Sequence, residues 1–187
     1  MATTTSPTTT APDLEILLAA LAERRGFLLH TAKELTDDQA RATPTVSTLS
    51  IGGLLKHVSS TERAWALFAR DGAQALGPEV DHENLDWGSP AAQAMMAERE
   101  REFSLLEDET LAQVVEHYQE TARRTEELVR GLADPDRAHP LPPAPWYEPG
   151  AAWSVRHVLA HLIGETAQHA GHADLIRESI DGQKTMD

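Results

Sequence analysis

The stretch that decides the fold is Trp153–Gly182, WSVRHVLAHLIGETAQHAGHADLIRESIDG. Ser154 is a residue type that caps helix N-termini and Gly182 one that follows helix C-termini, so the stretch predicts one long helix. One face of this helix carries a group of histidines and a glutamate together with Val158 and Ile176. The two aliphatic residues predict that this face points toward a core rather than toward water. At about 100° per residue, four polar residues share an arc of roughly 80° on that face: His161, Glu165, His169 and His172.

Glu165 and His169 stand one helical turn apart, so a carboxylate and an imidazole lie on the same side of the helix. Both groups are common ligands of divalent metals, and this spacing lets one helix supply two of them. Solvated helix faces normally carry Lys, Arg and Glu rather than a column of imidazoles. The stretch therefore indicates a metal site, and the alternative is a hydrogen-bonded histidine network inside the core.

Length and composition indicate one helical domain. The chain has 187 residues, which is typical of a single domain with a sizeable core. Residues 1–11 are rich in Thr and Pro, so we expect a disordered tail there and a single domain over residues 12–187. Only 5% of the residues are aromatic, while Ala, Leu, Glu and Arg are abundant, and this balance favours helix over sheet.

Charge and cysteine content exclude several classes of function. The formal net charge is −14, which disfavours binding to a nucleic-acid backbone. No apolar run approaches the ~20 residues of a membrane span, and the N-terminus has no secretory signal pattern. Cysteine is absent, so any thiol chemistry must use a small-molecule thiol. We expect a cytoplasmic protein with neither nucleic acid nor membrane as a partner.

Three further long segments have apolar residues at helical spacing between capping and stopping residues, namely 12–35, 51–72 and 110–131, and a shorter helix is expected over 90–103. His57 lies on the shoulder of the apolar stripe of the second long segment, where a lone histidine is usually an ordinary boundary residue. Four long helices without an alternating strand pattern predict an all-α four-helix bundle. The long connections after the second and third helices predict a crossover topology.

Residues 132–152 hold six prolines and lead directly into the last helix. A structureless connection of this length is uncommon in a compact domain and is often functional. Trp146 and Tyr147 lie in this segment and Trp153 follows it closely. We expect either a lid over the histidine end of the last helix or a strap whose aromatic residues cover the end of the bundle.

Two segments resemble a known superfamily. The segment Pro44–His57, PTVSTLSIGGLLKH, followed by Glu62-Arg63-x-Trp65, resembles the second-helix signature of the DinB-like superfamily. The segment Trp153–Arg177 resembles its last helix. The branch most similar to this chain contains mycothiol-dependent maleylpyruvate isomerase and the mycothiol S-transferases. The resemblance extends from about residue 13 to the end of the chain and implies a DinB-like four-helix bundle.

The resemblance also implies a metal site with three protein ligands: His57, Glu165 and His169. Many members carry His where this chain has Glu165, and that difference implies the thiol-transferase branch, with zinc favoured and nickel as the other metal. Three residues are expected in the pocket or behind the ligands: Trp153, His161 and His172. His161 is also a rival ligand. His157 is expected on the helix surface, outside the site.

The implied function is a metal-dependent S-transferase in which the metal activates the thiolate of mycothiol toward a small electrophile, for detoxification or isomerisation. One alternative is a metal-dependent hydrolase at the same site. A second alternative is a non-catalytic, stress-associated bundle in which the histidines form a core network. Bundles of this type often associate through helix faces, so we also expect a possible homodimer.

Overall fold

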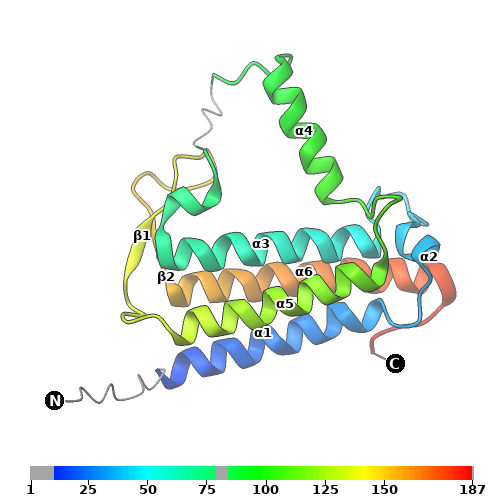
Figure 1. The fold of residues 1–187 in the computed structure, drawn as a ribbon, viewed down its shortest axis with the longest axis horizontal. Coiled ribbons are helices and arrows are strands. Elements are labelled where there is room, and N and C mark those ends of the chain that lie inside the picture. The colour runs from blue at the N-terminus through cyan, green and yellow to red at the C-terminus, as the bar shows by residue number, and fades with distance from the viewer. Residues whose placement is uncertain (1–10, 79–83, 187) are drawn as a thin grey trace.

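Figure 1 shows the fold of the chain in a computed structural model that describes residues 11–78 and 84–186. The predicted disordered tail lies, except for Ala11, outside the described residues. The described residues form six α-helices, one short 3-10 helix and two short strands: α1 (Pro12–Thr31), α2 (Asp37–Arg41), α3 (Ile51–Asp71), η1 (Ala73–Leu76), α4 (Pro90–Glu102), α5 (Leu111–Arg130), β1 (Ala138–Pro140), β2 (Ala152–Ser154) and α6 (Val155–Asp181).

The four long helices α1, α3, α5 and α6 lie alongside one another, which confirms the predicted all-α four-helix bundle (Figure 1). Helix α6 packs against α1 and α3, and α3 also packs against α5. Helices α3 and α5 run in the same direction, because the connection that holds η1 and α4 returns the chain along the length of the bundle (Figure 1). The predicted crossover is therefore found after α3, whereas the connection after α5 stays at one end. Within the described residues, no helix combines the length and apolarity that crossing a membrane requires.

The helix boundaries follow the capping chemistry of the sequence. The side chain of Ser50 accepts a hydrogen bond from the backbone N–H of Gly53, and Ser154 caps α6 in the same way. Gly182 ends α6 with a left-handed φ of 80°. The first helix ends earlier than predicted, at Thr31 rather than near residue 35, because the chain turns through Glu34 at a φ of 62°.

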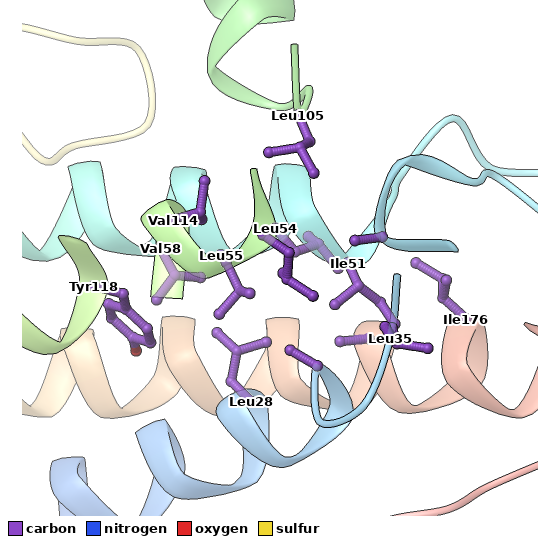
Figure 2. Packing of buried hydrophobic residues seen from close by; sticks show 14 of the residues in the cluster. Leu28, Leu35, Ile51, Leu54, Leu55, Val58, Leu105, Val114, Tyr118 and Ile176 are labelled. Carbon is purple, nitrogen blue, oxygen red and sulfur yellow. The ribbon is translucent and has the colours of Figure 1, made fainter. Parts of the chain in front are cut away.

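Two apolar clusters fill the bundle, one toward each end. Figure 2 shows side chains of the first cluster pointing into the space between α1, α3, α5 and α6, among them Leu28, Leu54, Leu55, Tyr118 and Ile176. The second cluster includes Leu18, Phe68, Val129, Leu159 and Leu162. Each fully buried leucine contributes about 1.5–3 kcal/mol to folding relative to an exposed one. The clusters thus supply the main force that holds the four helices together.

A buried polar layer lies between the two clusters. Arg25 of α1 donates to both carboxylate oxygens of Glu62 of α3, at 2.9 and 2.7 Å, and to Glu126 of α5 at 3.1 Å. Arg25 is 4% exposed and Glu62 is fully buried. Beside them, Ser59 donates to Thr121 at 3.0 Å. This network fixes the relative position of three helices, because each charge needs its partner once it is out of water.

The crossing connection presses directly onto α3 at two adjacent glycines. A Cβ atom at Gly53 would lie 1.8 Å from the carbonyl oxygen of Phe103, and one at Gly52 would lie 2.8 Å from the Cβ of Leu105. Figure 2 shows Leu105 directed at α3 from the chain that follows α4. Only glycine permits so close an approach of one backbone to another. The end of α4 is therefore fixed over one turn of α3.

The proline-rich segment is tied to the bundle by a short antiparallel ladder. His139 pairs with Trp153, and the ladder is extended by a hydrogen bond from the N–H of Leu141 to the carbonyl of Ala151 at 2.9 Å. The prediction of a structureless connection without strands was therefore wrong here, because two three-residue strands are too short to show an alternating pattern. The ladder gives the segment the form of a strap across the bundle end; its opening as a lid stays a prediction.

We expect Gly53→Ala to destabilise the protein by about 1–3 kcal/mol, since the methyl group displaces the Phe103 carbonyl and this cost exceeds the ~1 kcal/mol gain in helix propensity. Urea unfolding measures the change. Gly26→Ala on α1 is the matched control, because nothing lies within 4 Å of its added Cβ, and it should be neutral or slightly stabilising. Equal stability of the two variants would show that the close approach at Gly53 is absent.

Arg25→Met should cost about 3–5 kcal/mol in unfolding free energy, because it leaves the Glu62 carboxylate buried without its partner. The double variant Arg25→Met/Glu62→Leu should recover most of that loss. Arg124→Ala serves as a control, since its ion pair with Glu120 is exposed and such pairs contribute under about 1 kcal/mol. A loss below about 1 kcal/mol for Arg25→Met contradicts the proposed role of the buried pair.

Candidate metal centre

The packing of α3 against α6 brings together side chains that lie over a hundred residues apart in sequence. His57 comes from α3, while Glu165 and His169 come from successive turns of α6. One possible ligand atom from each residue lies within 4.8 Å of the other two. The Nε2 atom of His169 is 3.3 Å from Oε2 of Glu165. All three side chains are half-buried, so the cluster lies at the margin of the core.

The donor set fits a divalent cation. Zinc binds imidazole nitrogen and carboxylate oxygen at about 2.0–2.2 Å, which places tetrahedral ligand atoms about 3.3–3.5 Å apart. The Glu165–His169 pair already has this separation. The His57 ligand atom lies within 4.8 Å of both, so a shift of at most about 1.5 Å brings it to the separation of tetrahedral ligands. Nδ1 of His57 is buried and has no hydrogen-bond partner, a cost that a bound metal or a nearby carboxylate removes. Two imidazoles and one carboxylate are a ligand set typical of zinc sites that keep an open position.

The protonation states favour metal binding. Burial lowers the pKa of His57 to about 4, with His169 acting in the same direction and Glu165 partly offsetting both. Burial also lowers the pKa of His169, again against the effect of Glu165. Both imidazoles are therefore neutral at pH 7, which is the state in which a ring nitrogen donates its lone pair to a metal.

Two residues at the C-terminal end of α4, Glu102 and Phe103, shape the surroundings of His57. The rings of Phe103 and His57 stack with centroids 3.9 Å apart and planes at 22°. Oε1 of Glu102 lies 4.0 Å from Nδ1 of His57, one ångström beyond a hydrogen bond. Sequence reasoning missed both residues. The available signal was the Gly52-Gly53 pair. Adjacent glycines in a helix indicate a close backbone contact, but they do not identify the segment that makes it.

The other predicted residues of the last helix flank the cluster. His172 approaches His169 with their Nδ1 atoms 3.5 Å apart, on the side of His169 that faces away from Glu165. His161 lies one turn before Glu165, with 4.0 Å between Nε2 and the carboxylate, and burial lowers its pKa. His161 is not part of the three-residue cluster. His157 is exposed, in agreement with its expected place outside the site.

Aromatic rings cover the bundle end beside the cluster. Trp153 is stacked between Trp65 and His157, with centroid distances of 4.7 and 4.3 Å. His161 contacts both tryptophans, at 4.9 and 5.0 Å. Tyr147 of the strap meets Trp153 at 5.7 Å. This aromatic wall connects the strap to the metal-facing side of α6 through His161.

The predicted orientation of the histidine face was only partly right. His161, Glu165, His169 and His172 are half-buried, and the core of α6 is formed by neighbouring residues: Leu159, Leu162, Thr166, Ala170, Ala173 and Ile176. Glu165 lies beside buried Thr166, where α6 passes from Leu162 of the second apolar cluster to Ala170 of the first. A half-buried position shields the cluster from bulk water and leaves one side accessible to a small molecule.

Comparisons with known proteins show the fold and the family of the chain. Among solved structures, a crystal structure of a conserved protein from Enterococcus faecalis is similar at a TM-score of 0.61 and 12% identity, covering 90% of this chain and 97% of that one. At that identity the likeness concerns the fold alone. No curated protein matches the chain. A family profile described as mycothiol-S-transferase matches residues 16–182, which include all three residues of the cluster, and the chain therefore belongs to the mycothiol S-transferase family, within the DinB-like superfamily.

Proposed function

We propose that this protein is a metal-dependent S-transferase that joins mycothiol to small electrophiles. The observation that carries the proposal is the cluster of His57, Glu165 and His169 within 4.8 Å, in a chain of the mycothiol S-transferase family. We assign these three side chains as the metal ligands. Zinc is the metal that the donor set favours, and nickel is the second candidate.

A divalent metal, when bound, supplies a positive charge that lowers the pKa of a thiol. The residues of the chain hold that charge in place and keep the ligands unprotonated. In the transfer, the thiol loses its proton to a base, the sulfur forms a bond to the electrophilic carbon, and the leaving group departs with the bonding electrons. His172 lies behind His169 and is a candidate to orient it, since ligand imidazoles usually have a second partner at the other ring nitrogen.

The aromatic wall suits the electrophile. Trp153 and Tyr147 are partly exposed and present apolar surface next to His161, one turn from Glu165. Trp65 lies buried behind Trp153. Such surfaces bind apolar substrates and exclude water, which protects a reactive electrophile from hydrolysis. We infer that the strap contributes to acceptor binding. The cytoplasmic location and the homodimer stay predictions.

Metal analysis tests the ligand assignment. Wild-type protein purified with added zinc should hold about one metal ion per chain, and His169→Ala should lose most of it, because two remaining ligands bind divalent metals far more weakly. His157→Ala is the matched control on the same helix and should keep the wild-type metal content. Equal metal content and affinity in wild type and His169→Ala would refute the assignment.

The thiol requirement separates transfer from hydrolysis. Incubation with mycothiol and monochlorobimane should yield a fluorescent conjugate that depends on metal, and removal of the metal by a chelator should abolish it until zinc is restored. The hydrolase alternative predicts turnover of an ester or amide without added thiol. A metal-loaded protein that forms no conjugate with mycothiol contradicts the proposed function.

Glu102→Gln should weaken zinc affinity by about 10–100-fold, because a carboxylate beside a ligand imidazole raises its basicity and holds its orientation. The measurement is competition with a zinc-binding dye. Glu100→Gln is the control, since Glu100 is exposed on the same helix. An unchanged affinity in Glu102→Gln would show that this carboxylate does not assist His57.

A further inference from the structure

A cavity of 760 Å³ lies between α3, the end of α4 and the start of α5, next to the metal cluster but outside it. Ser60 and Arg63 line it from α3, and Arg101 and Glu102 line it from α4. Glu102 also lies 4.0 Å from Nδ1 of His57. One carboxylate thus belongs to the wall of the cavity and to the surroundings of the metal cluster.

The walls of this cavity are fixed by hydrogen bonds. Lys56 donates to the carbonyls of Arg101 and Ser104 at 3.1 and 2.7 Å and to the carboxylate of Glu109 at 2.6 Å. Arg41 donates to the carbonyls of Leu106 and Glu109. These bonds hold the segment after α4 against α2 and α3. The cavity is therefore preformed, which reduces the entropy cost of binding a ligand.

The charge of the lining indicates the class of ligand. The chain has a net charge of −14, but the charged residues that line the cavity balance to zero. They are three cations, Lys56, Arg63 and Arg101, and three carboxylates, Glu98, Glu102 and Glu109. Neither guanidinium group, of Arg63 or of Arg101, forms an ion pair with any residue in the described part of the chain. A balanced set of donors and acceptors suits a neutral ligand with many hydroxyl groups better than an anion.

The geometry points to this cavity as the site for the hydroxyl-rich, non-sulfur part of the thiol co-substrate, an inference that rests on the proposed function. In mycothiol that part is a glucosamine joined to inositol, which is neutral and carries many hydroxyls. Leu106 and Val114 add apolar surface to the cavity, against which the C–H faces of a sugar ring pack. Binding there leaves the cysteine to extend past Glu102 toward His57. Arg63 and Arg101 then determine which thiol the protein accepts.

The test uses S-methyl mycothiol, whose capped sulfur is a poor metal ligand, titrated calorimetrically into metal-free and zinc-loaded protein. Wild type should bind it in both forms. Arg63→Gln/Arg101→Gln should bind it at least tenfold more weakly, since each side chain loses its charged donors. Ser60→Phe, which narrows the cavity without removing a charge, should weaken binding as well. Zinc content should stay that of wild type in both variants.

Arg124→Gln is the matched control, because Arg124 is exposed on α5 and does not line the cavity. Failure of metal-free wild type to bind S-methyl mycothiol, or wild-type affinity in both cavity variants, overturns the inference. If conjugate forms with an unchanged KM for mycothiol in the double variant, the cavity assignment fails and the proposed function stands. If S-methyl mycothiol binds as expected but no conjugate forms, the proposed function fails and the cavity assignment stands.

Discussion

The contact between the Phe103 carbonyl and the backbone of Gly53 is the constraint on which the site depends. A side chain at residue 53 would occupy the place of that carbonyl, at 1.8 Å. Because the position is glycine, the end of α4 packs closely on α3, Phe103 stacks on His57, and Glu102 lies 4.0 Å from the same imidazole. The cavity exists for the same reason, since its outer wall is the chain that this contact fixes.

The polar layer and the metal cluster lie at the same level of the bundle. Arg25 and Glu62 are buried between two apolar clusters, and Glu165 and His169 lie at the margin of the same layer of the bundle, beside buried Thr166. A bundle that was apolar throughout would bury more hydrophobic surface, but it would leave no place for neutral imidazoles next to a carboxylate. The bundle therefore combines two apolar ends, which supply stability, with a polar middle that supplies ligands.

Much of the fold could be predicted because its signals are local. Ser50, Thr110 and Ser154 each cap a helix as their position indicates, and the side-chain-to-backbone bonds involved span only three residues. The β ladder of the strap was not predicted, since residues 141–151 connect its two strands and a connection of that length carries no two-residue hairpin signal. The earlier end of α1 was also missed. Glu34 has a left-handed backbone conformation, and a residue other than glycine in that conformation cannot be recognised from the hydrophobic pattern.

The sequence by itself determined the four amphipathic helices, their caps, and the Glu165–His169 pair, because residues four apart on a helix share a face whatever surrounds them. Only the tertiary structure decided that His57 meets that pair, since it lies 108 positions before Glu165 and no local rule relates two helices. It also decided the role of Glu102 and the presence of the cavity. Both arise from the angle at which a connecting helix returns to the bundle, and that angle depends on the packing of the whole chain rather than on any one segment.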